Sequence, residues 1–97
     1  MTKHEVLDRL TERAQDVRQR FAVKTLAVFG SVARGEGRAG SDVDVLVAFD
    51  GPADFDRFMD LKFFLEDILG VRVDLVTDKA LRPQLRPAIE REAIHVA

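Results

Sequence analysis

Residues 24–49 read KTLAVFGSVARGEGRAGSDVDVLVAF, and this stretch decides the fold. It begins and ends with short apolar segments, Lys24–Phe29 and Asp42–Phe49, and four of the six glycines of the chain lie between them. Short apolar runs that are partly β-branched and stop at glycine indicate buried strands, whereas clustered glycines indicate a loop. We therefore predict two strands joined by a loop over Ser31–Ser41, with one helical turn at Ser31–Arg34.

The second of these strands has two different faces. Successive side chains of a strand point to opposite sides of the sheet. Val43, Val45 and Val47 therefore share one face, and Asp42 and Asp44 share the other. The pattern predicts a strand that buries its valines and presents two neighbouring carboxylates on the opposite side.

Helical periodicity flanks this central stretch. Apolar residues recur at steps of three and four across residues 6–21, and Thr2 and Glu5 have the spacing of a capping box. A second helical period covers residues 55–68, and Gly70 is placed to end that helix as a left-handed cap. We predict one long helix before the central stretch and another after it.

The remaining elements complete a small sheet. Val71–Val76 alternates in the manner of a third strand, and Pro83 and Pro87 precede a short last helix and a few extended residues at 94–96. The length of 97 residues suits one domain. We expect a single α/β (α+β) domain over residues 1–97, with a small mixed sheet of three to four strands flanked by helices.

Composition excludes several classes of protein. The net charge is −2 and basic residues form no run, so we expect no direct DNA binding. The chain contains no cysteine, which rules out disulfides and thiolate chemistry and fits a reducing compartment. No apolar run resembles a signal peptide or a membrane span, so we expect a cytoplasmic protein with no membrane partner.

Three aspartates stand where a sheet is otherwise apolar. Asp42 and Asp44 lie two residues apart on one strand face, and Asp74 is the single acid in Val71–Val76. Neighbouring carboxylates on a half-buried sheet repel one another and lose hydration, so they take up a proton or bind a cation. Oxygen ligands favour a hard ion such as Mg²⁺ or Mn²⁺. We predict that Asp42, Asp44 and Asp74 are catalytic and metal-binding residues.

The loop before these acids has the features of a phosphate site. Gly30 allows close approach of an anion, and free backbone N–H groups and the Ser31 hydroxyl can donate to it. Arg34 lies one turn further on, and Ser41 directly precedes the acidic strand. With two metal ions roughly 4 Å apart, such a site would support nucleotidyl transfer from a nucleoside triphosphate.

Each of these residues also has a purely structural interpretation. The two acids of the strand could form a surface charge pair, Gly30 could end a strand, and Arg34 could be a solvated loop charge. Arg72 is expected to be the ion-pair partner of Asp74 or a surface residue. The coincidence of the acids with the Gly-Ser turn favours the catalytic interpretation.

The segments GSVARG at residues 30–35 and GSDVDVLV at residues 40–47 resemble the GSxARG…SDxD signature of the MNT-type minimal nucleotidyltransferases in the DNA polymerase beta superfamily. Asp74 matches the third carboxylate of that pattern. The resemblance implies the nucleotidyltransferase fold and two metal ions bound by the first two aspartates, with the third helping to deprotonate the acceptor. Many such proteins are similar to antitoxins that silence a HEPN-type toxin by moving AMP from ATP onto a tyrosine of the toxin.

Two functions therefore compete. The first is an ATP- and Mg²⁺-dependent enzyme that adenylylates a hydroxyl of a HEPN-type toxin. The second is a non-catalytic, nucleotide-binding antitoxin that neutralises the toxin by covering it. The three acids favour the enzyme, because an antitoxin that only covers the toxin would not need carboxylates that destabilise the sheet. A small-molecule nucleotidyltransferase ranks lower, because it usually needs an added domain to hold its acceptor.

Overall fold

A computed structural model describes residues 1–38 and 40–97, so Ala39 of the predicted loop lies outside the described residues. In these ranges the helices are α1 (Lys3–Glu12), α2 (Ala14–Phe21), α3 (Gly30–Ala33), α4 (Phe55–Leu69) and α5 (Arg86–Glu92), and a 3₁₀ turn, η1, spans Asp78–Ala80. The strands are β1 (Val23–Phe29), β2 (Val43–Phe49), β3 (Val73–Thr77) and β4 (Ile94–His95). The expected α/β composition is confirmed.

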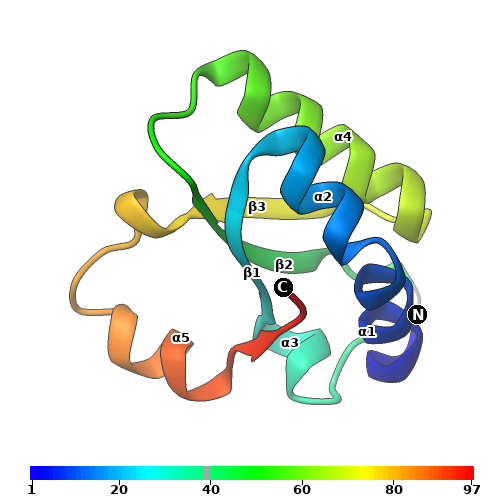
Figure 1. Ribbon diagram of the computed structural model, residues 1–97. Coiled ribbons are helices and arrows are strands. Elements are labelled where there is room, and N and C mark those ends of the chain that lie inside the picture. The colour runs from blue at the N-terminus through cyan, green and yellow to red at the C-terminus, as the bar shows by residue number, and fades with distance from the viewer. Residues whose placement is uncertain (39) are drawn as a thin grey trace.

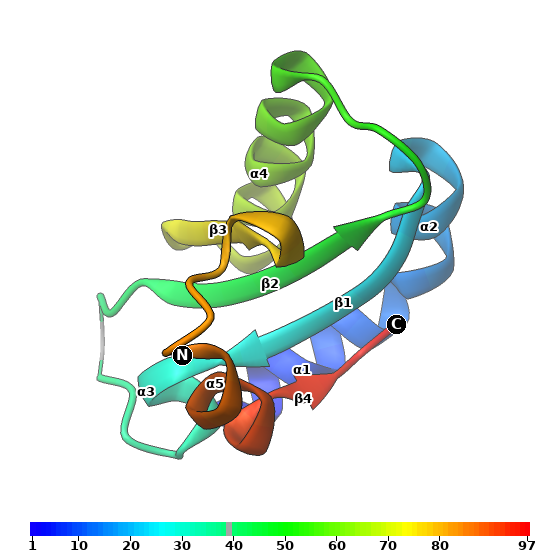
Figure 2. The ribbon, with the colours of Figure 1, turned by 90° about the vertical axis from the view of Figure 1, so that its left-hand side faces the viewer.

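The four strands form one mixed sheet in the order β3-β2-β1-β4 (Figure 2). β1 runs antiparallel to both β2 and β4, whereas β2 and β3 are parallel. A parallel pair requires a crossover connection, which α4 supplies between β2 and β3. Because of this crossover, β2 with Asp44 and β3 with Asp74 lie side by side and run in the same direction.

Three of the helices cover one face of the sheet. α1, α2 and α4 lie on one side and α5 lies on the other, which both views show (Figures 1 and 2). The predicted valine face of β2 is confirmed, since Val43, Val45 and Val47 are buried against these helices. The face of β2 that carries Asp44 is therefore turned away from the three larger helices.

The N-terminal helical region differs from its prediction. The capping box is confirmed, with Glu5 N–H donating to the Thr2 hydroxyl (3.2 Å) and Thr2 N–H donating to the Glu5 carboxylate (3.1 Å). The single long helix is wrong, because the structure has α1 and α2 with a break at Arg13. There the Arg13 N–H bonds the Leu10 carbonyl at 3.2 Å, the three-residue spacing of a tightened last turn. Apolar periodicity does not encode such a break.

Both ends of α4 are capped, by Asp54 at the start and by Gly70 at the end. The Asp54 side chain accepts the Arg57 N–H at 2.8 Å, which caps the first turn. Gly70 has a φ of 71° and ends the helix in the predicted left-handed conformation. Glu66, on the last turns of α4, accepts the Val73 N–H at 2.9 Å and so joins this helix to β3.

The apolar side chains of α4 lie partly in the core and partly on the surface. Leu61 and Leu65 are buried in the core, and Phe64 packs edge-on against Phe21 of α2 with ring centroids 5.3 Å apart. Phe55 and Phe63 are exposed. Among residues 1–38 and 40–97, no helix combines the length and the hydrophobicity that a membrane span needs.

Candidate active site

Two of the predicted catalytic acids are direct neighbours in the sheet. Asp44 of β2 and Asp74 of β3 are register partners in the parallel pair. Side chains of register partners point to the same face, so both carboxylates emerge together on the face away from α1, α2 and α4. Asp44 is half-buried and Asp74 is exposed. The topology thus brings together two acids that are 30 positions apart in the sequence.

The third acid, Asp42, lies one residue before β2 and is exposed. Its Oδ1 atom lies 4.0 Å from the Nε atom of Arg72. Of the two expectations for Arg72, the surface position is confirmed, because the residue is exposed. The pairing with Asp74 is wrong, since Arg72 precedes β3, which begins at Val73, and forms its ion pair with Asp42. With side-chain exposures of 85% and 51%, this ion pair is weak and easily exchanged.

The surroundings of Asp44 destabilise its charged form. The pKa of Asp44 is raised, chiefly because burial removes water from its carboxylate, and then because Asp74 and Asp42 lie nearby with the same charge. Glu92 adds a smaller repulsion of the same sign. A carboxylate with a raised pKa among other carboxylates gains stability from any cation that binds there.

The donor set fits a hard divalent cation, because carboxylate oxygens are the ligands that Mg²⁺ and Mn²⁺ prefer. Asp44 and Asp74 lie side by side, whereas Asp42 is paired with Arg72. Over residues 1–38 and 40–97, no three His, Cys, Asp or Glu side chains are already gathered around one point as a metal site. A cation held by all three aspartates would therefore require their side chains to move closer together.

The Gly-Ser turn lies against the acids. β1 ends at Phe29 and α3 begins at Gly30, whose φ is 74°. The carboxylate of Asp44 packs on Gly30 so closely that a β-carbon at position 30 would overlap Asp44 Oδ2. Glycine is required here for both reasons, since other residues rarely adopt this φ and none has room. The predicted phosphate turn and the predicted metal ligands therefore share one place.

Arg34 follows α3, and its guanidinium already binds two carboxylates of the protein. Its Nη1 atom donates to Glu92 Oε2 at 2.8 Å, and its Nε atom donates to Glu36 Oε2 at 3.0 Å. Glu92 also accepts the Gly30 N–H at 3.0 Å through its other oxygen. The Arg34 guanidinium holds the pKa of Glu92 below its usual range. Glu92 was not predicted from the sequence, because nothing local marks an acid of the last helix as a partner of residues 58 and 62 positions earlier.

The two serines have backbone contacts of their own. The Ser41 hydroxyl accepts the Arg38 N–H at 3.0 Å, and the Ser41 N–H donates to the Arg38 carbonyl at 2.9 Å. These bonds close the turn immediately before β2. Ser31 is half-buried in α3, and its carbonyl accepts the Glu36 N–H at 2.8 Å. Both serines thus shape the loop that connects the turn to the acids.

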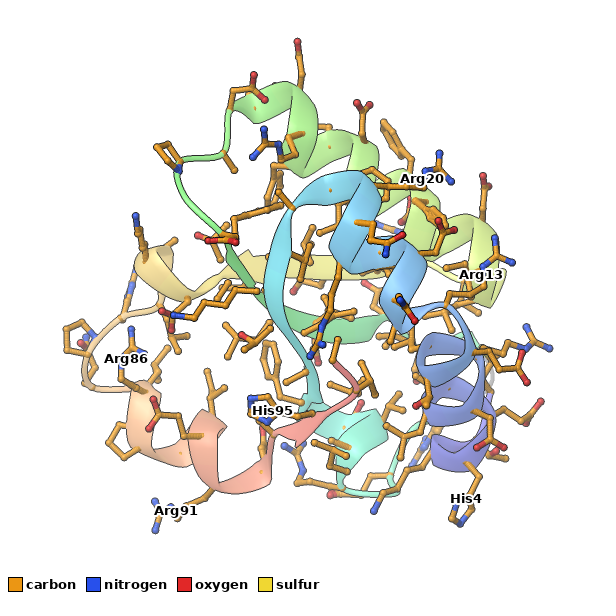
Figure 3. All side chains as sticks on the ribbon, in the orientation of Figure 1. His4, Arg13, Arg20, Arg86, Arg91 and His95 are labelled. Atoms are coloured by element: carbon orange, nitrogen blue, oxygen red, sulfur yellow. The ribbon has the colours of Figure 1, made fainter. Side chains whose placement is uncertain are left out.

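The two histidines form no site together. His4 lies on α1 and His95 on β4, both exposed, and Figure 3 shows them far apart. His95 pairs in register with Ala27, and Ala27 with Leu46, which puts His95 on the acidic face of the sheet one row from Asp44.

The chain belongs to the nucleotidyltransferase domain family, whose model matches residues 10–96. The fold and the grouping of Gly30, Asp44 and Asp74 agree with this class. A relative, the protein adenylyltransferase MntA of Thermococcus cleftensis, is 38% identical over 96 residues, covering 99% of this chain and 97% of its own. The predicted family is therefore confirmed.

Solved structures agree with this assignment. A candidate minimal nucleotidyltransferase superposes with a TM-score of 0.83 at 44% identity, covering 97% of this chain and 95% of that one. The MNT antitoxin complex with a tri-AMPylated HEPN toxin of Shewanella oneidensis has a TM-score of 0.68 at 16% identity, covering 94% of this chain and 71% of that one. At that identity the second comparison shows the fold alone. The predicted nucleotidyltransferase fold is confirmed.

Proposed function

We propose that this protein transfers AMP from ATP to a hydroxyl group of a partner protein. The observation that carries the proposal is the pairing of Asp44 with Asp74 against the Gly30 turn. The name of the Thermococcus cleftensis relative, a protein adenylyltransferase, supports the reaction. The similar fold of an MNT antitoxin bound to a tri-AMPylated HEPN toxin supports a toxin of that type as partner and an antitoxin role. We propose the cytoplasm as the compartment, because a chain without cysteine fits a reducing environment.

The three aspartates would hold the metal. Asp44 and Asp74 supply adjacent oxygens, and Asp42 supplies further oxygens once its weak contact with Arg72 is exchanged for a stronger one with a cation. Bound Mg²⁺, or Mn²⁺, would neutralise the triphosphate and lower the pKa of the attacking hydroxyl. The half-buried position of Asp44 strengthens its attraction to a cation, because less water screens the charge.

The turn would hold the triphosphate. The Gly30 N–H and the Arg34 guanidinium are donors that suit phosphate oxygens, and the Ser31 and Ser41 hydroxyls border the same loop. Asp74, on the open face beside the metal ligands, would take part in removing the proton of the acceptor hydroxyl. We propose a tyrosine of the toxin as the acceptor, as the resemblance to MNT-type antitoxins implies. This chain contains no tyrosine, so it cannot label itself on one.

The first experiment tests nucleotide binding without any partner. Mg²⁺ with ATP should raise the melting temperature of the protein, because the ligand binds the folded state. Asp44→Asn should abolish this rise. Asp8→Asn, at an exposed site on α1, is the matched control and should keep it. An equal rise in the Asp44→Asn variant would remove the basis of the proposal.

The second experiment distinguishes an adenylylating enzyme from an antitoxin that acts only by binding the toxin. The protein is incubated with labelled ATP, Mg²⁺ and a HEPN-type toxin, and both chains are analysed by mass spectrometry. An AMP adduct on the toxin that disappears with Asp44→Asn supports the transferase. A toxin that is inhibited equally by both proteins and carries no adduct would show that the protein acts by binding alone.

A further inference from the structure

The donors that would bind phosphate are already occupied by a carboxylate of the protein. Glu92 Oε1 accepts the Gly30 N–H at 3.0 Å, and Glu92 Oε2 accepts from Arg34 Nη1 at 2.8 Å. The two oxygens of one carboxylate therefore contact the two donors separately. In this arrangement the Glu92 carboxylate stands where phosphate oxygens would be expected.

A carboxylate and a phosphate compete for such donors. Both are anions that form short, charge-assisted hydrogen bonds with guanidinium and backbone N–H groups. The Gly30 N–H has one hydrogen, so it cannot serve both acceptors at full strength. Glu92 would also repel a bound triphosphate, in addition to Asp42, Asp44 and Asp74. Nucleotide binding at this turn therefore favours the removal of Glu92.

Glu92 belongs to an element that can move at low cost. No residue of α5 is buried, and the helix lies apart from the main core on the open side of the sheet (Figure 2). At its first turn Arg86 binds the Asp78 carboxylate (2.8 Å) and carbonyl (2.9 Å), and Glu92 holds its last turn. Segments with few buried contacts open locally at a small fraction of the global unfolding free energy.

We infer that Glu92 is an internal competitor of the nucleotide, and that the end of α5 withdraws when a triphosphate binds. The inference rests on the proposed function, because it assumes that the Gly30–Arg34 turn receives phosphate. It makes α5 a control point: whatever holds α5 in place weakens nucleotide binding, and whatever draws it away strengthens binding.

The test measures dissociation constants for Mg²⁺-ATP and for Mg²⁺-tripolyphosphate by calorimetry. Glu92→Gln keeps the shape of the side chain and removes its charge, so it should bind both ligands about tenfold more tightly than the wild type. Glu90→Gln changes an exposed acid of the same helix that lies away from the turn and contacts Arg86, and it should bind like the wild type.

Each outcome has a defined meaning. Unchanged or weaker binding by Glu92→Gln would overturn the inference and make Glu92 a support for the turn. If neither protein binds Mg²⁺-ATP, the proposed function is wrong. Tripolyphosphate then decides the inference alone: tighter binding by Glu92→Gln supports it, and no gain overturns it.

A second measurement uses only the wild type, in case the variant does not fold. Amide NMR signals are followed while Mg²⁺-tripolyphosphate is added. The Gly30 signal and those of α5 should shift together, at the same ligand concentration. A shifting Gly30 signal with unchanged α5 signals would contradict the withdrawal of Glu92.

Discussion

The carboxylate of Asp44 lies on the backbone of Gly30, with no room for a side chain between them. This contact connects the two halves of the candidate active site, the turn that follows β1 and the acid near the start of β2. It follows from the antiparallel register, in which Phe29 pairs with Asp44. A glycine that ends a strand is thus also the surface against which the candidate catalytic carboxylate of Asp44 packs.

Replacing Gly30 by alanine should harm both stability and the site. The new β-carbon would meet Asp44 Oδ2, and alanine is strained at a φ of 74°. We expect a loss of about 2–4 kcal/mol in unfolding free energy, from strain together with overpacking. The Mg²⁺-ATP-dependent rise in melting temperature should also disappear, because Asp44 must move.

Gly35 provides the matched control for this substitution. Its φ is 77°, close to that of Gly30, but a β-carbon there would meet nothing within 4 Å. Gly35→Ala should therefore show only the backbone strain, about 1–2 kcal/mol, and should keep the nucleotide response. Equal effects of the two variants on nucleotide binding would mean that the contact with Asp44 is unimportant. Chemical denaturation and thermal shift measure both quantities.

Asp74→Asn should stabilise the metal-free protein. Asp74 is a like charge directly opposite the half-buried Asp44 and contributes to its raised pKa. Removal of such a pair repulsion is worth about 0.5 kcal/mol, or roughly 2–4 °C in melting temperature for a chain of this size. The measurement is a thermal melt in the presence of a chelator. A clear loss of stability would show that Asp74 has a structural role instead.

Glu66 should make stability depend on pH in acid. The Val73 N–H, and then Lys62, hold the pKa of Glu66 below its ordinary value of 4.5. Its stabilisation is therefore complete above that ordinary value and is lost as the pH falls through the lowered folded-state pKa. At pH 7 the wild type should exceed Glu66→Gln by about 1 kcal/mol in unfolding free energy.

This difference should shrink toward zero in acid, because the wild-type side chain then becomes neutral like glutamine. Denaturant unfolding of both proteins at pH 7 and at a series of pH values below 4.5 measures it. A difference that stays constant over this range would mean that the charge of Glu66 does not stabilise the junction between α4 and β3.

Ala22→Gly should stabilise the protein. Ala22 ends α2 with φ 53° and ψ 48°, a left-handed conformation that glycine adopts without cost. The gain should be about 0.5–1 kcal/mol, after allowance for the greater freedom of glycine in the unfolded chain. Ala88→Gly, in the middle of α5, is the control and should lose about as much. If thermal melts showed that both variants stabilise the protein, or that both destabilise it, the prediction for Ala22 would be wrong.

The sequence predicted local structure well where a local signal exists. The Thr2–Glu5 capping box, the left-handed Gly70 and the valine face of β2 were all predicted, because each depends on residues within a few positions of one another. The break at Arg13 was not predicted, since an amphipathic period continues through it unchanged. The start of β3 was placed two residues too early, because Val71 and Arg72 follow the helix cap before pairing begins.

The sequence by itself determined the family, the identity of the candidate acids and the position of the glycine turn, since these depend on residue types at fixed spacings. Tertiary structure alone decided which groups meet. The parallel register of β2 and β3 places Asp44 beside Asp74. Arg72, which precedes β3, pairs with Asp42. The position of α5 brings Glu92 into contact with Arg34. The physical reason is that hydrogen bonds and charges act over a few ångströms in space, and only the folded chain brings such distant positions within that range.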